Sequence, residues 1–360
     1  MKPYKVGLVG LRRGSSLVRP FELFPETEIT ALCDVNTTSL TEAARAFAVD
    51  DKNLFTDYTA LLNSDVDIVV VGTPIQFHAA QSIQALEAGK HVLSEVTAAY
   101  TLEDCQRIVD TARRSRGVYM MGENTCYFHY IRQWKSWVQQ GRLGDIFYAE
   151  CEYIHNIQQL LFDDSRGESY WRLHRPPIYY CSHSLGPVLQ LMNDYVVQVT
   201  CLSAGNQILN RAEAGTLDME VALCKTAKGK VIKLLRSQVA RREPPTHTYT
   251  LYGTKGFLET NGDGGHGDTT GKLYVEGEHG KQYETIRCPI SDPNAPAEAL
   301  MGGHGSTEYY MVRDFIDAIQ ANRRPPIDAV AAAQMTAPGI CAHESALKGG
   351  QWIDVPTFHW

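Results

Sequence analysis

The stretch that decides the fold is Val6-Gly7-Leu8-Val9-Gly10-Leu11-Arg12-Arg13-Gly14-Ser15, close to the N-terminus. An apolar run that passes directly into spaced glycines predicts a buried strand, a tight turn and a helix, the arrangement that holds a dinucleotide. Asp34 follows the next apolar run, Glu28–Cys33, and lies 24 residues after Gly10. An acidic side chain there accepts hydrogen bonds from the adenosine ribose and repels a 2′-phosphate. The sequence therefore predicts an NAD-binding domain and favours NAD over NADP.

The glycine turn departs from the usual GxGxxG fingerprint, because Arg12 stands where the second glycine is expected. The arginines either flank the pyrophosphate or are simply solvated. Asp34 has its own alternative, a helix cap or turn residue. From this part of the chain we predict cofactor contacts for Gly10, Arg12, Arg13, Gly14 and Asp34.

Further short apolar runs alternate with helical patterns up to about residue 120. The strand candidates after the first two are Val66–Gly72, His91–Ser94 and Val118–Gly122. Thr101-Leu-Glu-Asp104 is a variant of the capping box that opens a helix. Strands separated by helices of this size predict a parallel sheet with crossovers on both faces.

Loops at the carboxyl ends of such strands line the ligand crevice of a parallel sheet. Pro74 fixes the turn after the third long strand, and we expect the polar side chains around it to face the crevice. Ser94-Glu95-Val96-Thr97 occupies the same edge one strand further on. The cofactor contacts predicted here are Thr73, Pro74, Gln76, His78 and Glu95.

The pattern of apolar and polar residues changes after Asn124. Alternating segments follow at Ile146–Tyr153, Val196–Ala204, Leu217–Cys224, Val231–Val239 and His247–Tyr252, which predict a mostly antiparallel, open sheet. We expect surface loops over 261–305, a helix capped by Ser306, and a last helix from Asp328 that Pro338 interrupts. The fold class is thus α/β, with a doubly wound Rossmann domain over 1–123 and an α+β domain for substrate binding and oligomerisation over 124–360.

Composition narrows the expected location and the expected partners of the protein. The chain has 360 residues, a net charge of -7, and nine cysteines without a CxxC pair, which predicts reduced thiols and a cytoplasmic location. We expect no nucleic-acid or membrane partner, because the balance is acidic, no signal peptide is recognisable, and the longest aliphatic run, Ile68–Val71, is far shorter than the ~20 residues of a membrane span. No pattern of metal ligands is present in the sequence.

Together these blocks resemble the Gfo/Idh/MocA oxidoreductase family over the whole chain. Ordinary dehydrogenases of that family carry Glu-Lys-Pro where Glu95-Val96-Thr97 stands, and their lysine lies beside the sugar hydroxyl and the nicotinamide. The resemblance implies NAD as cofactor and a small-molecule sugar or glycoside as substrate. It also implies a homo-oligomer, a dimer or tetramer, formed through the open face of the second sheet.

The subgroup that shares Val96 is glycoside hydrolase family 109, which uses NAD to cleave glycosides. Its cofactor contacts resemble Glu95-Val96 and Asn124, so the resemblance adds Val96 and Asn124 to the cofactor set. Its substrate contacts resemble Tyr153-Ile154-His155, Trp171-Arg172 and the block Tyr180-Cys181-Ser182-His183-Ser184-Leu185-Gly186-Pro187. Cys181 and Ser182 replace its Pro and Thr. The resemblance implies His183, Tyr180 and Tyr153 as catalytic residues, and Arg172, His155 and Tyr127 as substrate-binding residues.

Oxidation of a sugar hydroxyl requires a base for its proton. Histidine is suited by its pKa of ~6.5, and tyrosine only if a cation such as Arg172 lowers its pKa from ~10. The main hypothesis is oxidation at C3, elimination and glycosidic cleavage with internal recycling of NAD. The alternatives are a sugar or inositol dehydrogenase that releases NADH, and a non-catalytic NAD-binding sensor. The alternative for these residues is a purely structural role. Tyr153 would then pack within the sheet, and His183 would be an ordinary packed histidine.

Overall fold

The computed structural model describes residues 2–163, 168–210, 217–263, 265 and 267–360. Contacts divide the chain into two compact units. The first unit comprises Met1–Tyr127, Ser291–Ala333 and Phe358–Trp360, and the second comprises Phe128–Ile290 and Gln334–Thr357. The division of the chain into domains at residue 123 remains a prediction.

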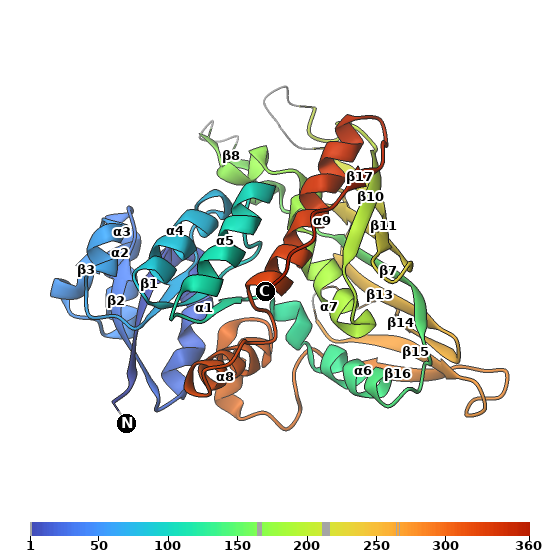
Figure 1. Ribbon diagram of the computed structural model, residues 1–360, viewed down its shortest axis with the longest axis horizontal. Helices are drawn as coiled ribbons and strands as arrows, with labels where there is room; N and C mark the ends of the chain where they lie inside the picture. Colours follow the sequence, from blue (N-terminus) through green and yellow to red (C-terminus); the bar gives the residue numbers. More distant parts are fainter. Residues whose placement is uncertain (1, 164–167, 211–216, 264, 266) are drawn as a thin grey trace. The chain divides into compact units, whose positions relative to one another are not determined.

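The first unit contains a six-stranded parallel sheet with the order β3-β2-β1-β4-β5-β6, of which Figure 1 labels β1, β2 and β3. Its strands are β1 (Tyr4–Val9), β2 (Thr27–Cys33), β3 (Leu54–Phe55), β4 (Ile68–Val71), β5 (His91–Ser94) and β6 (Tyr119–Met121). Its helices are α1 (Leu11–Val18), α2 (Thr37–Phe47), α3 (Tyr58–Leu62), α4 (Ile75–Glu87), α5 (Leu102–Arg114) and α8 (Thr307–Gln320). The predicted doubly wound Rossmann sheet is confirmed, and the strand order reverses between β1 and β4, where such sheets bind ligands.

Local sequence explains these elements. All four residues of β4 are buried, as a central parallel strand requires. Thr101 caps α5 as predicted, because its side chain accepts a hydrogen bond of 3.1 Å from the amide of Asp104.

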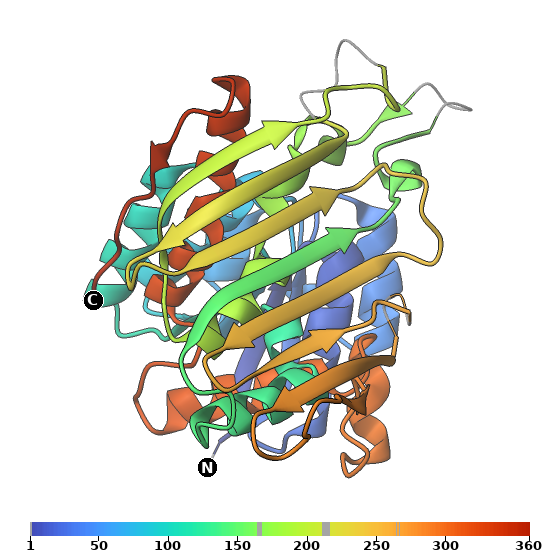
Figure 2. The ribbon, with the colours of Figure 1, turned by 90° about the vertical axis from the view of Figure 1, so that its right-hand side faces the viewer.

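The second unit contains a nine-stranded sheet with the order β16-β15-β14-β13-β7-β12-β11-β10-β17, which faces the viewer in Figure 2. Among the described pairings of this sheet, that of β7 with β12 is parallel and the others are antiparallel, so the predicted mostly antiparallel sheet is confirmed. The strands are β7 (Ile146–Ile154), β10 (Val196–Ser203), β11 (Met219–Thr226), β12 (Val231–Ser237), β13 (Thr246–Gly253), β14 (Gly256–Thr260), β15 (Thr269–Val275), β16 (Glu284–Cys288) and β17 (Ile353–Asp354). The helices are α6 (His129–Gln139), α7 (Ser182–Met192) and α9 (Ala329–Leu347), which begins in the first unit.

Shorter elements complete the chain. The strands β8 (Phe162–Asp163) and β9 (Glu168–Ser169) form a small separate sheet. The 3-10 turns are η1 (Arg19–Leu23), η2 (Asp51–Asn53), η3 (Asn124–Tyr127), η4 (Gln158–Leu160), η5 (Trp171–His174), η6 (Pro177–Tyr180) and η7 (Ala297–Gly302).

Three predictions about the second half were wrong. The stretch 261–305 contains β15 and β16 rather than loops alone, and Gly271 serves close strand approach there, because a Cβ would lie 2.5 Å from the carbonyl oxygen of Glu259. Ser306 precedes α8, but its hydroxyl accepts from the amide of Asp292 instead of capping the helix. Pro338 lies inside a continuous α9.

The alternation along β7 separates the two faces of the large sheet. Ala149, Cys151 and Tyr153 are buried on one face, called here the inner face, whereas Glu150 and Glu152 on the other face are only half-buried. The inner face carries the residues of the second half of the candidate site.

Candidate active site

The glycine turn after β1 packs directly on the turn after β4. Gly10 has a φ of +84°, and a Cβ there would lie 2.5 Å from the amide nitrogen of Thr73. A Cβ on Gly14 would lie 2.6 Å from Cδ1 of Leu8. The glycines at 10 and 14 therefore meet a steric requirement, and they leave the backbone at the start of α1 open to a ligand.

Asp34 lies at the carboxyl end of β2, half-buried, beside the start of α1. Its Oδ2 accepts from the amide of Leu11 and its Oδ1 from the amide of Asn36, each at 2.8 Å. Asp34 thus orders its own turn and the glycine turn together. Its carboxylate retains lone pairs for ribose hydroxyls, since a carboxylate accepts about four hydrogen bonds.

The two arginines of the glycine turn have different surroundings. Arg12 is exposed. Arg13 is half-buried, and its Nε lies 2.9 Å from Oε1 of Glu95, while Oε2 of Glu95 accepts from the amide of Val96 at 3.1 Å. The Arg13–Glu95 ion pair therefore connects the turn after β1 to the segment after β5, which holds the buried Val96.

Hydrogen bonds from neighbouring side chains hold the segment after β4 in place. The Thr73 hydroxyl donates to Oε1 of Gln81 at 2.6 Å, and Gln76 is exposed just after Pro74, at the start of α4. The ring nitrogens of His78 lie 2.6 Å and 2.9 Å from the carbonyl oxygens of Thr73 and Thr97. Burial lowers the pKa of His78. The expectation that this side chain faces a crevice is therefore corrected, because the ring is buried between two backbone segments that it positions.

Asn124 provides an independent test of whether this unit suits a cofactor. It is buried, and its side-chain Oδ1 has no hydrogen-bond partner in the described part of the chain. A buried, unpaired amide oxygen is costly unless a ligand supplies a donor. Together with the glycine turn and Asp34, this orphaned oxygen fits NAD. Tyr127, in contrast, donates its hydroxyl to Oδ2 of Asp314 at 3.0 Å.

Four inward side chains form a row across the central strands of the second unit. Strand register aligns Glu220 on β11 with Arg236 on β12, Arg236 with Tyr153 on β7, and Tyr153 with His247 on β13. All four are buried. Because residues in register on one face are direct neighbours, the pairing of distant segments creates this cluster.

Tyr153 is the centre of the row. Its hydroxyl lies 3.1 Å from Nδ1 of His155, and its ring stacks on His247 with centroids 4.4 Å apart. The guanidinium carbon of Arg236 lies 3.9 Å from the centroid of the Tyr153 ring, a cation–π contact.

The predicted Tyr180 and His183 join this cluster from η6 and from the first turn of α7. The His183 ring, near the start of α7, meets Tyr180 edge-on at 4.7 Å and Tyr153 at 5.9 Å. Its backbone carbonyl accepts from the hydroxyl of Tyr249 at 2.5 Å. The structure thus brings the pair Tyr153 and His155 together with the pair Tyr180 and His183, which follows it along the chain.

Arginines surround the aromatic rings of the cluster. Arg172 lies over the Trp171 ring at 4.4 Å. Arg175, which is buried, lies over Tyr180 at 4.4 Å and donates from Nη2 to Oε1 of Gln238 at 2.7 Å. Burial first, and then the charges of Arg236 and His183, lower the pKa of His155 to about 4.

Sequence reasoning missed Arg236, His247 and Arg175. One signal was available for Arg236, because it follows Ile232 and Leu234 in the inward phase of an alternating strand, where a charged residue is out of place. His247 opens a recognised strand segment in the same phase as Tyr249 and Leu251. Which strands pair, and hence which residues meet Tyr153, is not contained in local alternation.

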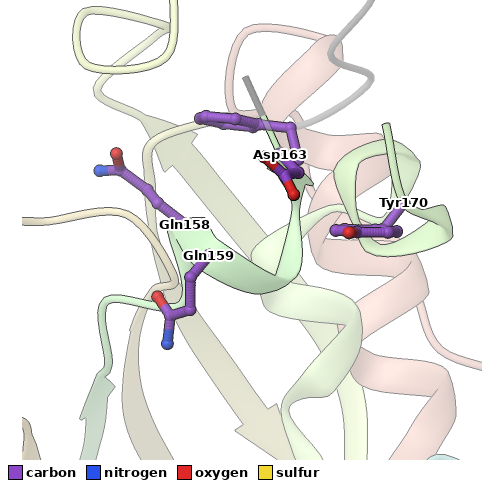
Figure 3. A pocket seen from close by; sticks show the side chains of 5 residues that line it. Gln158, Gln159, Asp163 and Tyr170 are labelled. Carbon is purple, nitrogen blue, oxygen red and sulfur yellow. The ribbon is translucent and has the colours of Figure 1, made fainter. Parts of the chain in front are cut away.

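A separate pocket lies on the segment between β7 and η5. It is lined by Gln158, Gln159, Phe162, Asp163 and Tyr170, and Figure 3 shows Asp163 between the two glutamines and Tyr170. None of the predicted site residues lines it. Within the described ranges, no group of three or more His, Cys, Asp or Glu side chains is arranged to hold a metal ion. The helices that the structure describes also include none with the length and apolarity of a membrane span.

Comparisons with known proteins agree with both halves of the fold. Residues 4–123 match the oxidoreductase family with an NAD-binding Rossmann fold, and residues 192–360 match the C-terminal domain of glycosyl hydrolase 109. A glycosyl hydrolase family 109 protein of Solibacter usitatus is 28% identical, with 98% of this chain and 88% of that protein covered. An alpha-N-acetylgalactosaminidase of Shewanella oneidensis is 26% identical, with 99% of this chain and 85% of that protein covered.

Solved structures share the fold at lower identity. A levoglucosan dehydrogenase in complex with NADH and L-sorbose superposes with a TM-score of 0.83 and 20% identity, over 99% of this chain and all of that one. An inositol dehydrogenase homologue of Azotobacter vinelandii, in complex with NADH and myo-inositol, has a TM-score of 0.78 and 18% identity, with 98% of each chain covered. The chain thus combines a match to the NAD-binding Rossmann domain of the Gfo/Idh/MocA oxidoreductase family with a match to the C-terminal domain of glycosyl hydrolase 109, and it is similar over its length to glycosyl hydrolase family 109 proteins.

Proposed function

We propose that this protein is an NAD-dependent enzyme that acts on a sugar or glycoside by removing a hydride from C3 of the ring. Bound NAD would accept that hydride and return it at the end of each cycle. A ketone at C3 makes the proton on C2 acidic, so the substituent on C1 leaves by elimination. Water then adds at C1, and the ketone is reduced. The net reaction is hydrolysis of the glycosidic bond with no net consumption of cofactor.

The observation that carries this proposal is the cluster of Tyr153, His155, Tyr180 and His183. The reaction needs one group for the hydroxyl proton, one for the C2 proton and an acid for the leaving group. A dehydrogenase that only transfers hydride needs the first of these alone. Several proton-transferring side chains within contact of one another therefore favour the longer reaction.

Val96 supports the same choice. Where dehydrogenases of the family carry a lysine, this chain has a buried aliphatic side chain with no proton to exchange. Proton transfer then falls to the tyrosines and histidines of the cluster. In this proposal His183, Tyr180 and Tyr153 are catalytic, and Arg172, His155 and Tyr127 contact the sugar. The cofactor contacts are those predicted from the sequence, with His78 acting by positioning the turn that contains Thr73.

The decisive test is a panel of aryl glycosides and free sugars given to the purified protein with NAD. We expect chromatography to detect a released sugar while the absorbance of NADH stays constant. Net NADH formation from free sugars without cleavage would contradict the proposal and favour a simple dehydrogenase. Intact NAD binding with no turnover of any substrate would favour a non-catalytic NAD-binding role.

The setting of the enzyme follows from surface and cysteine chemistry. All nine cysteines are buried thiols, which supports a reducing, cytoplasmic location. On the outer face of the large sheet, Leu202, Val221 and Leu223 are 39–58% exposed. Exposed apolar side chains on neighbouring strands support a homo-oligomer formed through this face.

A further inference from the structure

Arg236 is a buried cation to which the described residues supply no acidic partner. Its side chain is 2% exposed, Nη1 donates to the carbonyls of Tyr153 and Ser237 at 2.7 Å and 3.2 Å, and the buried Nε has no partner in the described chain. No carboxylate of the described residues forms an ion pair with it. A buried charge is unfavourable unless a compensating charge or hydrogen bonds are nearby.

The carboxylate in register with Arg236, which could balance its charge, already has other hydrogen-bond partners. Glu220 lies in register with Arg236 across the sheet, but its Oε1 accepts from Nδ1 of His343 at 2.8 Å and its Oε2 from the amide of Ile178 at 3.0 Å. The groups that do face the guanidinium are two phenol rings, Tyr153 at 3.9 Å and Tyr180 at 5.7 Å.

We propose that Arg236 is a positioning residue whose charge stabilises deprotonated Tyr153, so that the Tyr153 phenolate takes the proton of the sugar hydroxyl. This inference rests on the proposed function. In the step, the O–H bond at C3 breaks and its proton passes to Oη of Tyr153. The C–H bond at C3 breaks with its electron pair passing to NAD as hydride, and a C=O bond forms. The return of hydride and proton reverses each change.

Three histidines in contact with Tyr153 agree with this assignment. His155, directly after β7, contacts its hydroxyl, and as a neutral ring with a proton on Nδ1 it can donate to a phenolate. Burial, Arg236 and His183 together lower the pKa of His155 to about 4, so this histidine is a weak proton acceptor. His247 from β13 stacks on the phenol, and His183 from α7 meets its edge.

Arg236 itself is coupled to both phenols. Burial lowers its pKa, whereas the charges of Tyr153 and Tyr180 raise it. Interaction between two sites is reciprocal, so a charged Arg236 favours the phenolate. Tyr153 is the stronger candidate, because its ring is closer and its hydroxyl has the contact with His155.

The test is a pH titration of the substrate-free protein with tyrosine labelled by carbon-13 at Cζ, followed by NMR. Tyr153→Phe and Tyr180→Phe assign the two resonances. We expect the Tyr153 resonance to titrate at least one unit below the ordinary pKa of ~10. A Tyr153 midpoint at or above ~10 in the unsubstituted protein overturns the proposal, whether or not the Arg236 variants fold.

Variants of Arg236 give a second, independent readout. Arg236→Met should move the Tyr153 midpoint up by at least about one pH unit, and Arg236→Lys, which keeps the charge, should restore most of the shift. A folded Arg236→Met protein with an unchanged midpoint would refute the role. A merely structural cation would change thermal stability without moving this resonance.

The same variants separate this inference from the proposed function. If glycosides are cleaved, the acidic limb of the pH–rate profile should shift to higher pH in Arg236→Met. Cleavage with a profile that does not depend on Arg236 overturns the inference and keeps the function. A low, Arg236-dependent Tyr153 midpoint in a protein that cleaves nothing supports the residue pair and overturns the function.

Discussion

At the scale of single residues, the site depends on side chains whose neighbours are supplied by other strands. Tyr153 contacts His155 within its own strand segment, but Arg236 and His247 reach it only through sheet pairing. Asp34 and Asn124 occupy the positions that the sequence assigns to cofactor binding. The two sets can be tested separately, because each belongs to a different compact unit.

His183→Ala should lower kcat/KM at least about 100-fold and leave NAD affinity unchanged. The backbone carbonyl of His183, rather than its ring, carries the hydrogen bond from Tyr249, so the substitution preserves that anchor. Steady-state kinetics and NAD titration by fluorescence measure the two effects. The matched control is His359→Ala, an exposed histidine close to the C-terminus. Loss of NAD binding in His183→Ala would show that the residue is misassigned.

Asp34→Asn should weaken NAD binding about tenfold and improve NADP binding relative to NAD. The change removes the charge that repels a 2′-phosphate and weakens the hydrogen bonds to the ribose, which for a charged group contribute about 1.5–3 kcal/mol. Asparagine keeps one acceptor oxygen for the amide of Leu11. Calorimetric titration with both cofactors measures the ratio, with Asp57→Asn, a cap of α3, as control. An unchanged NAD:NADP ratio would contradict the assignment.

At the scale of elements, helix ends and strand register determine what each segment does. The start of α8 illustrates this, because Glu308 in its first turn is buried and accepts from Nδ1 of His304 at 2.5 Å and from the hydroxyl of Thr307 at 2.8 Å. Burial raises the pKa of Glu308, but these hydrogen bonds and the charge of His304 outweigh it, so the pKa lies below its ordinary value.

This shift predicts how the contribution of Glu308 to stability depends on pH. A carboxyl group whose pKa is lower in the folded state stabilises the protein above its unfolded pKa, and the contribution is lost as the pH falls through the folded pKa. Glu308→Gln should therefore lower the free energy of unfolding by about 1–3 kcal/mol at pH 7. The difference from the unsubstituted protein should shrink below pH ~4. Urea unfolding at several pH values measures it, and a difference that grows toward acid pH would contradict the assigned ion pair.

At the scale of the whole chain, each unit buries a core of its own, and the large sheet leaves one face uncovered by its own unit. The exposed Leu202, Val221 and Leu223 lie on β10 and β11, and Leu202 is directly in register with Val221. When such faces associate, apolar surface is removed from water, and each Å² that is buried stabilises the complex by about 25 cal/mol.

Leu223→Asp should convert the proposed oligomer to monomer, because a charge would be buried without a partner in the interface. Size-exclusion chromatography with light scattering measures the mass. Leu300→Asp is the matched control, since this leucine is 55% exposed and belongs to η7 in the first unit rather than to the large sheet. A monomeric unsubstituted protein, or an oligomer unaffected by Leu223→Asp, would refute the interface.

The sequence by itself determined the fold class, the NAD-binding half and the family. Those properties are written in local patterns: the apolar run before Gly10, the acid at Asp34 and the capping box at Thr101 each act within a few residues or one βαβ unit. It failed where local signals are weak, as in β15 and β16, whose glycine- and proline-rich surroundings look like loops although close strand approach requires Gly271.

Only the tertiary structure decided the surroundings of Tyr153. Alternation shows that Arg236 and His247 point inward, but strand order and register determine that both flank the same phenol. Register also decides that Glu220 lies beside Arg236, and packing turns its carboxylate toward His343 instead. The physical reason is that sheet pairing joins segments as far apart in sequence as Gln198 and Asp354. The energy that selects one register comes from packing and burial of the whole face rather than from any local stretch of sequence.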